Sequence, residues 1–257
     1  MSSELDINFT PEYLDEIARR IDKDGVVCIE RAVKPESLAR WRQELQRNIK
    51  AQGLRYFSII QPWQQPGSEY EALARDDNFK QLLTGLTSRG HPGHQDHSDI
   101  YNVLRVIAGP RGGDHSLQFH YDASVVTVLI PLEIPTGTPE ESGDLITYPN
   151  RRPIRGSSLL NFLDKLCIQN PIARIYWSRR IANRRDDSNI VRLKPGNIYL
   201  FWGYRTLHAN LGCRSDSLRA TLLFHHGDPH RNSLMTKAIK WTRARRERRN
   251  LVSANVK

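Results

Sequence analysis

Residues 117–134 read LQFHYDASVVTVLIPLEI, a run dominated by the β-branched and aromatic residues that are typical of β-strands. Gly, Pro, Asp and Asn residues of the kind that form turns separate this run from similar ones. The sequence therefore predicts that the second part of the chain folds into a β-sandwich or β-barrel. The other runs expected to be strands are residues 26–30, 100–107, 145–148, 190–193, 198–204 and 218–226.

The chain before residue 90 predicts helices. Thr10-Pro11-Glu12 supplies the N-cap hydroxyl, the first-turn proline and the acid that begin a helix, and Gly25 is placed to end it. Helices followed by many short strands indicate an α+β fold with a mainly β core. Further helices are expected at residues 35–52, 69–86 and, as an insert between strands, 157–168.

The composition is that of a globular protein, with 257 residues of which 39% are hydrophobic and 26% charged. The polar, acidic start is unlike a secretory signal, and the most apolar run, 125–134, is shorter than the roughly 20 residues that span a bilayer. Cys28, Cys167 and Cys213 lie too far apart for a CxxC pair or a zinc framework. We therefore expect a cytoplasmic protein with no membrane span.

No linker or repeat divides the chain, so we expect a single domain over residues 1–257. In this interpretation, a helical support precedes the β core, the core carries a basic insert, and a basic helix or tail follows it. The corresponding ranges are residues 1–90 for the support, 100–230 for the core, 151–189 for the insert and 231–257 for the tail.

The net charge of +10 is concentrated in two segments. Nine Lys or Arg and one acid lie between residues 151 and 185, and eight Lys or Arg and one acid between 237 and 257. The rest of the chain is mildly acidic. Such segments suit an anionic partner or substrate, and they equally suit helix faces in contact with water.

His120 and Asp122 are two residues apart, so in a strand both side chains point to one face and can bind one metal ion. His94-Gln95-Asp96 has the same spacing. It lies in a loop rich in Gly and Pro, where no strand fixes its geometry. We therefore prefer His120 and Asp122.

Two further residues lie downstream of this pair. His208 follows the aromatic run 198–204, and Arg219 begins the strand that contains Thr221 and His225 on the same face. A buried arginine is costly unless it is paired, and its planar fork suits a carboxylate. Two histidines and one carboxylate with open positions form the ligand set of non-haem Fe(II) oxygenases.

The set His120-x-Asp122, His208 and Arg219 resembles the motif of the Fe(II)/2-oxoglutarate-dependent dioxygenases. These enzymes share a double-stranded β-helix, a jelly-roll or cupin-like barrel. Gly143-Asp144-Leu145 is similar to a segment of the phytanoyl-CoA dioxygenase-like branch, and residues 195–219 resemble the closing segment of that branch. The likeness covers roughly residues 102–229, and Pro149-Asn150-Arg151 departs from the pattern of the branch.

The resemblance implies Fe(II), 2-oxoglutarate and O2 as cofactor and co-substrates. It implies His120, Asp122 and His208 as the catalytic iron ligands and Arg219 as the residue that binds the far carboxylate of 2-oxoglutarate. Asn210 and Arg105 are further candidates for binding the co-substrate, and Arg105 also for binding substrate. Halogenating members replace the aspartate with a small residue. The presence of Asp122 therefore implies hydroxylation or a related oxidation. We expect the substrate to be a small molecule, with an anionic or carrier-tethered one as an option, and the reaction to release succinate and CO2.

Two other functions are open at this point. The basic segments suit an oxidative demethylase of nucleic acid, but such members usually carry a second arginine where this chain has His225. A non-catalytic β-barrel binding module would keep the scaffold without turnover. The oligomeric state is not predicted. Four histidines are expected in loops near the mouth of the site, namely His91, His94, His97 and His115.

Overall fold

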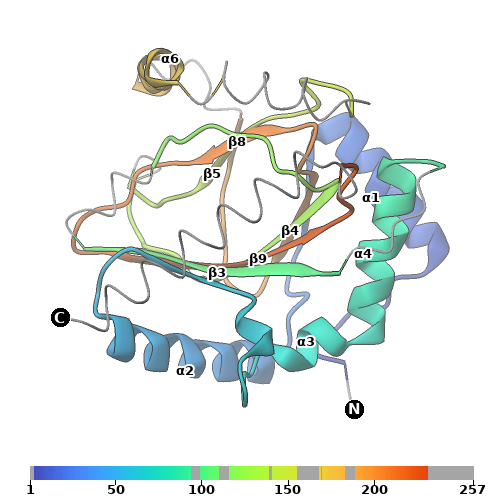
Figure 1. The fold of residues 1–257 in the computed structure, drawn as a ribbon, viewed down its shortest axis with the longest axis horizontal. Helices are drawn as coiled ribbons and strands as arrows, with labels where there is room; N and C mark the ends of the chain where they lie inside the picture. Colours follow the sequence, from blue (N-terminus) through green and yellow to red (C-terminus); the bar gives the residue numbers. More distant parts are fainter. Residues whose placement is uncertain are drawn as a thin grey trace.

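The computed structural model describes residues 3–93, 99–109, 116–138, 141–154, 168, 170–182 and 189–230. It shows a mixed α/β architecture with two antiparallel sheets, and helices surround them (Figure 1). In spatial order the larger sheet consists of β1 (Val26–Ile29), β7 (Ile198–Trp202), β4 (Val126–Glu133), β9 (Leu218–His226), β3 (Tyr101–Ala108) and β2 (Phe57–Ile60). The smaller sheet consists of β6 (Ile190–Val191), β5 (Leu145–Tyr148) and β8 (Leu207–Asn210).

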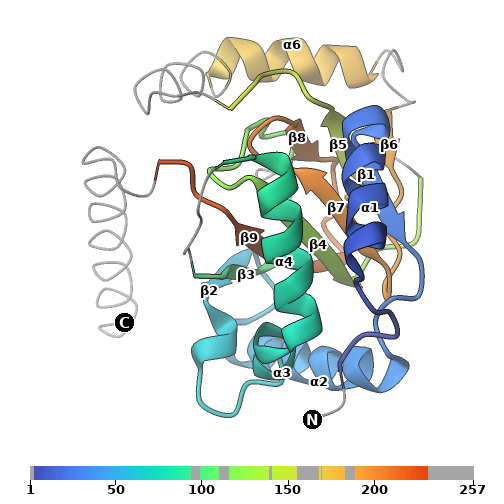
Figure 2. The same ribbon diagram turned by 90° about the vertical axis from the view of Figure 1, so that its right-hand side faces the viewer.

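Helices cover the outer sides of both sheets. Figure 2 shows α6 lying across the smaller sheet, with α2 and α3 at the opposite end of the molecule. The ring of Trp177 in α6 lies 4.6 Å from that of Tyr148 and 5.0 Å from that of Phe119, which attaches the helix to the smaller sheet. The helices are α1 (Pro11–Asp24), α2 (Pro35–Gln52), the 3-10 turn η1 (Pro62–Gln64), α3 (Glu71–Arg75), α4 (Asp77–Gly90) and α6 (Pro171–Ala182).

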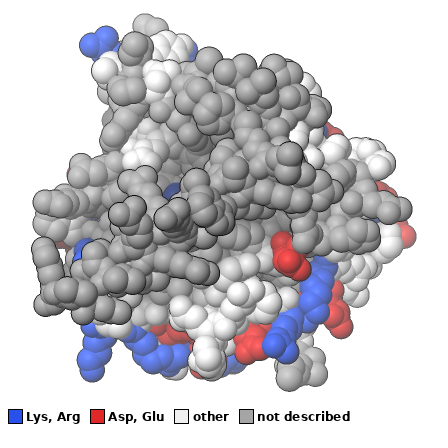
Figure 3. All heavy atoms as spheres, in the orientation of Figure 1, with Lys and Arg blue, Asp and Glu red and all other residues white. Residues whose placement is uncertain are grey.

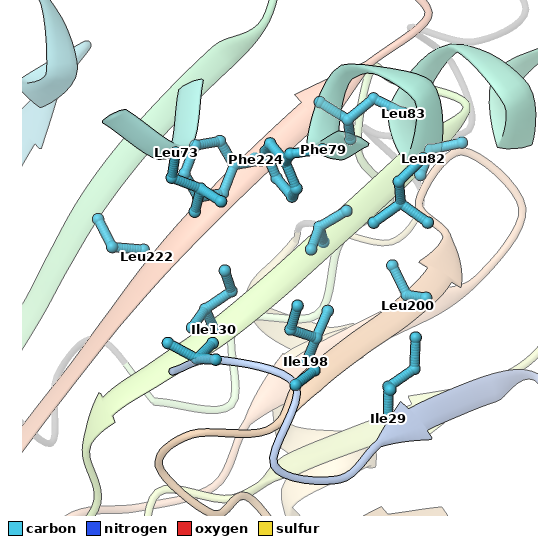
Figure 4. Packing of buried hydrophobic residues seen from close by; sticks show 14 of the residues in the cluster. Ile29, Leu73, Phe79, Leu82, Leu83, Ile130, Ile198, Leu200, Leu222 and Phe224 are labelled. Atoms are coloured by element: carbon cyan, nitrogen blue, oxygen red, sulfur yellow. The ribbon is translucent and has the colours of Figure 1, made fainter. Parts of the chain in front are cut away.

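Strand alternation divides the larger sheet into two different faces. On β9, Leu222 and Phe224 point toward the helices, and the ring of Phe224 meets that of Phe79 edge to face at 4.8 Å (Figure 4). The alternate residues Arg219, Thr221 and His225 face the other way, toward the smaller sheet. The helix side therefore carries the main core, and the polar residues are directed into the space between the sheets.

A smaller apolar cluster joins the two sheets. Leu129 and Phe201 of the larger sheet pack with Leu145 of the smaller sheet and with Leu193, which follows β6. Tyr199 belongs to the same cluster, and its hydroxyl donates to the carbonyl of Arg192 at 2.7 Å. This cluster fixes the distance between the sheets at one end.

The first helices confirm the sequence prediction. Thr10 caps α1 by accepting a hydrogen bond from the amide of Tyr13, and Gly25 ends the helix with a φ of 86°. The helix expected over residues 69–86 is instead two helices. The carboxylate of Asp76 accepts hydrogen bonds from the amides of Asn78 and Phe79, so the chain begins a new helix there.

The β elements depart from the prediction at three places. Residues 117–125 form no strand: Leu117 has a left-handed φ of 55°, residues 123–125 are bends, and only His120 forms a bridge, because the chain leaves the smaller sheet there and crosses to the larger one. Neither β2 nor β8 was expected as a strand, nor α6 as a helix. The helix expected over 157–168 lies outside the described residues except for Ile168. The two facing sheets agree with a jelly roll, but the described residues show no closed barrel.

Among the described helices, none is both long and apolar enough to cross a membrane. Cys28 and Cys213 are free thiols, whereas Cys167 lies outside the described residues.

Candidate metal centre

Three side chains that the sequence singled out converge between the two sheets. His120, Asp122 and His208 each offer one ligand atom, and these atoms lie within 4.8 Å of one another. His120 and His208 also exchange backbone hydrogen bonds of 3.0 and 3.1 Å, so the segment around His120 lies directly beside β8. Two residues later, the amide of Asp122 donates to the carbonyl of Gly203 at the end of β7, at 3.0 Å. The segment thus carries two candidate ligands, His120 beside the smaller sheet and Asp122 beside the larger sheet.

Both histidines are held in the tautomer that a metal ion requires. The Nδ1 of His120 lies 2.8 Å from the carbonyl oxygen of Gln118, and the Nδ1 of His208 lies 3.1 Å from that of Thr206. Because a carbonyl only accepts hydrogen bonds, Nδ1 carries the proton and Nε2 keeps its lone pair. Both Nε2 atoms face Asp122, at 3.7 and 3.6 Å from its carboxylate oxygens. A ligating histidine typically has this second hydrogen bond.

The carboxylate of Asp122 is fixed from the larger sheet. Thr127 on β4 donates its hydroxyl to Oδ2 at 2.5 Å, and Nδ1 of His225 lies 3.7 Å from the same oxygen. Gly203 makes room for this arrangement, because a Cβ there would lie 2.2 Å from the Thr127 hydroxyl and 2.7 Å from Oδ2. Strand alternation predicted the face of His225 correctly but could not find Thr127 or Gly203. The strand expected over residues 117–134 would place Thr127 on the face opposite Asp122, and no local signal marks Gly203.

The electrostatic environment keeps His120 and Asp122 in the protonation states that bind a metal ion. Burial, together with the neighbouring His208, lowers the pKa of His120 to about 3. Burial alone would raise the pKa of Asp122. The surrounding histidines, His208 foremost, and the Thr127 hydroxyl nevertheless bring that pKa below its usual range. A neutral imidazole and an ionised carboxylate are the forms that bind a metal cation.

Arg219 is buried on the same inward face of β9 as His225, with 1% of its surface exposed. Its Nε donates to the carbonyl of Gly143 at 2.6 Å, and Nη1 lies 3.4 Å from the Thr221 hydroxyl. Its Nη2 is buried and has no hydrogen-bond partner among the described residues. Burial lowers the pKa of Arg219 to about 10, so the group remains a cation at neutral pH. A buried cation with one unused donor is suited to binding an anion.

The Gly143-Asp144 segment explains how Arg219 is held. Gly143 has a φ of 66°, and a Cβ there would lie 2.4 Å from the Sγ of Cys213 and 2.5 Å from the Cδ of Arg219. Asp144 is buried and binds Arg192 at 2.9 Å and the amide of Leu193 at 2.9 Å. Asp144 is therefore already paired, and the Arg219 guanidinium is left available.

The two remaining candidates lie on inward faces. Asn210 is two residues after His208 on β8, half-buried on the side of the ligand. Arg105 is on β3 directly opposite Thr221 of β9, and its side chain is half-buried. Of the loop histidines, His91 follows the end of α4, and His94, His97 and His115 lie outside the described residues, as does Asp96.

Outside the site, positively and negatively charged side chains of the described residues lie next to one another. Figure 3 shows Lys and Arg side chains interspersed with Asp and Glu along the lower edge, where α2 and α3 lie in Figure 1. Arg40 binds Glu4 and Arg75 binds Glu71 there, both at 2.6 Å. About half of the basic segment 151–185 and all of the segment 237–257 lie outside the described residues, so their role stays a prediction.

No protein-family model matches the chain, and no curated protein matches its sequence. Several solved structures share its fold. A prolyl 4-hydroxylase from Phytophthora capsici is 17% identical, with a TM-score of 0.55 over 90% of this chain and 70% of that chain. SnoN, a non-heme alpha-ketoglutarate-dependent epimerase from nogalamycin biosynthesis, is 15% identical, with a TM-score of 0.54 over 85% of this chain and 84% of that one. AviO1 from Streptomyces viridochromogenes Tue57 is 15% identical, with a TM-score of 0.52 over 84% of this chain and 95% of that one.

At these identities the likeness shows a common fold. The chain therefore has the same fold as these proteins, and between its sheets it carries a two-histidine, one-carboxylate cluster that could hold a metal ion.

Proposed function

We propose that this protein is an Fe(II)- and 2-oxoglutarate-dependent dioxygenase that hydroxylates a small molecule, anionic or carrier-tethered, and releases succinate and CO2. The observation that carries the proposal is the convergence of His120, Asp122 and His208 on one point, with the buried cation Arg219 on an adjoining strand. The fold shared with known 2-oxoglutarate-dependent enzymes supports it.

In this proposal the two imidazole Nε2 atoms and the Asp122 carboxylate hold Fe(II), and three ligands leave open positions for other molecules. The bound metal with O2 and 2-oxoglutarate supplies the oxidising chemistry. The protein contributes ligand orientation. The carbonyls of Gln118 and Thr206 fix both histidine tautomers, and the Thr127 hydroxyl fixes the carboxylate.

Arg219 binds the far carboxylate of 2-oxoglutarate through its unused Nη2, while Gly143 holds its Nε. Asn210 lies on the ligand side of β8 and donates a further hydrogen bond to the co-substrate. Gly143 and Asp144 lie in the segment that resembles the phytanoyl-CoA dioxygenase-like branch. We propose assignment to that branch on this resemblance.

Structural neighbours include an epimerase as well as hydroxylases, so the fold alone does not choose the reaction. We infer hydroxylation because Asp122 occupies the carboxylate position instead of a small residue. We further propose that the whole chain forms one domain and acts in the cytoplasm. His225 lies where nucleic-acid demethylases usually carry a second arginine, which disfavours that alternative.

The test is iron-dependent turnover of 2-oxoglutarate by the full chain. We expect purified protein with Fe(II) and ascorbate to form succinate above the rate of a no-iron control. His208→Ala should abolish this turnover, whereas His91→Ala, which alters a histidine outside the cluster, should retain it. The absence of both 2-oxoglutarate binding and succinate formation, with and without a metabolite library, would contradict the proposal.

A further inference from the structure

Part of the inward face of β3 and β9 is only half-buried. Val103 and Leu223 are direct cross-strand partners there, and Arg105 pairs with Thr221 one position further along that face. Val103, Arg105 and Leu223 are only half-buried, although their neighbours on the helix side are fully buried. Val103 and Leu223 therefore present apolar surface beside the positive charge of Arg105, on the face directed between the two sheets.

The described part of the chain offers Arg105 no anionic partner. Its Nε is buried without a hydrogen-bond partner, and no described carboxylate forms an ion pair with it. It also adds to the positive potential of the site. Burial is the main reason that the pKa values of His120, His225 and Arg219 lie below their usual ranges, and Arg105 lowers all three further. A partly desolvated guanidinium that has no ion-pair partner among the described residues and lies near the cation Arg219 is costly, which indicates that an anion belongs there.

The charges of the proposed enzyme leave Arg105 unmatched. A divalent metal with Asp122 carries one net positive charge, and Arg219 adds a second. These two charges balance the two carboxylates of 2-oxoglutarate. Asp144 is neutralised by Arg192 at 2.9 Å. When the co-substrate is bound, Arg105 therefore remains the one uncompensated cation among the described residues of the site.

We propose that Arg105 binds the single anionic group of the substrate, while Val103 and Leu223 contact an apolar part of the same molecule. The inference rests on the proposed function and names its substrate class, a monoanion with an apolar body. Arg105 is half-buried, whereas Arg219 is 1% exposed, so Arg105 is the better placed of the two to meet a molecule that enters from solvent.

The test compares octanoate with octanamide, which share an apolar chain and differ in charge. Binding to the protein is measured by isothermal titration without oxygen, in the presence of Fe(II) and saturating 2-oxoglutarate. We expect wild type to bind octanoate about tenfold or more tightly than octanamide. Arg105→Gln should remove this preference and change the Kd of 2-oxoglutarate by less than about threefold. Arg105→Lys, which keeps the charge, should retain part of the preference.

Arg75→Gln is the matched control, because it removes one exposed arginine of α3 and should leave the octanoate preference unchanged. Equal binding of the two probes by wild type, or an unchanged preference in Arg105→Gln, would overturn the inference. So would a loss confined to 2-oxoglutarate affinity, because Arg105 would then bind the co-substrate. Failure of wild type to bind 2-oxoglutarate at all would instead contradict the proposed function.

Discussion

Gly143 has two independent reasons to be glycine. Its φ of 66° lies in the left-handed region, and a side chain there would meet both Cys213 and Arg219. Its carbonyl accepts the Nε of Arg219 at 2.6 Å, so any movement of this segment also moves the guanidinium. One backbone position therefore affects both the stability of the protein and the orientation of the anion-binding arginine.

We expect Gly143→Ala to lower the free energy of unfolding by about 2–4 kcal/mol, through left-handed strain and crowding together. Gly67→Ala is the control, because Gly67 has a φ of 74° but no atom near a new Cβ. It should cost only about 1 kcal/mol. Urea unfolding measures both. Equal losses would show that the contact with Cys213 and Arg219 does not matter.

Replacing Arg219 tests the co-substrate role directly. Arg219→Lys keeps a positive charge but lacks the planar fork that holds Gly143 and an anion at once. We expect the Kd of 2-oxoglutarate to rise about 10- to 100-fold, which corresponds to the loss of one charged hydrogen bond, while metal affinity stays the same. Titration calorimetry measures both. Arg205→Lys, which alters a surface partner of Asp22, should change neither value.

The proximity of His120 and Asp122 could be predicted because their signal is local, whereas His208 was predicted through its resemblance to a known motif. His120 and Asp122 are two residues apart, and the structure brings them together even though the expected strand is absent. The contribution of Gly203 could not be predicted. It depends on the approach of residue 122 to the end of β7, which is a contact between distant segments.

At the scale of elements, capping explains which boundaries could be predicted. Thr10 and Gly25 bound α1 through their own side-chain and backbone properties, so the sequence identifies both ends. Asp76 also caps a helix, but it lies within an apolar pattern that continues across it, and the pattern alone joins α3 to α4. Strands as short as β2 and β8 depend on their partners in the sheet and carry little signal of their own.

Tyr199 connects β7 to the segment that follows β6. Its hydroxyl donates to the carbonyl of Arg192 and accepts from the amide of Lys194 at 2.8 Å. Tyr199→Phe leaves both backbone groups without this partner, and we expect a loss of about 1–3 kcal/mol in urea unfolding at pH 7. Tyr176→Phe, at an exposed position of α6, should have little effect.

The same hydroxyl gives a pH dependence of known sign. Burial raises the pKa of Tyr199 above its ordinary value, so the folded state favours the neutral phenol. This contribution is complete below about pH 10 and is lost as pH rises further, because the unfolded chain releases the proton first. Wild type should therefore lose stability more steeply above pH 10 than Tyr199→Phe does. Parallel slopes for the two proteins would contradict this account.

At the scale of the whole molecule, the candidate metal centre links the two sheets. His208 lies on β8 of the smaller sheet, and the Asp122 carboxylate is held by Thr127 on β4 of the larger sheet. A bound divalent ion therefore joins elements that otherwise meet through the apolar cluster around Leu129 and Leu145. Because the unfolded chain lacks this arrangement, metal binding must stabilise the folded state.

We expect Mn(II), a redox-stable substitute for Fe(II), at about 100 times its Kd to add about 2.7 kcal/mol to the free energy of unfolding. For a chain of this length that is a rise of about 5–10 °C in Tm, which EDTA should reverse. His208→Ala should show no rise, because it removes a ligand, whereas His91→Ala should show the full rise. An equal rise in His208→Ala would place the metal elsewhere in the molecule and separate the stabilising ion from the proposed active site.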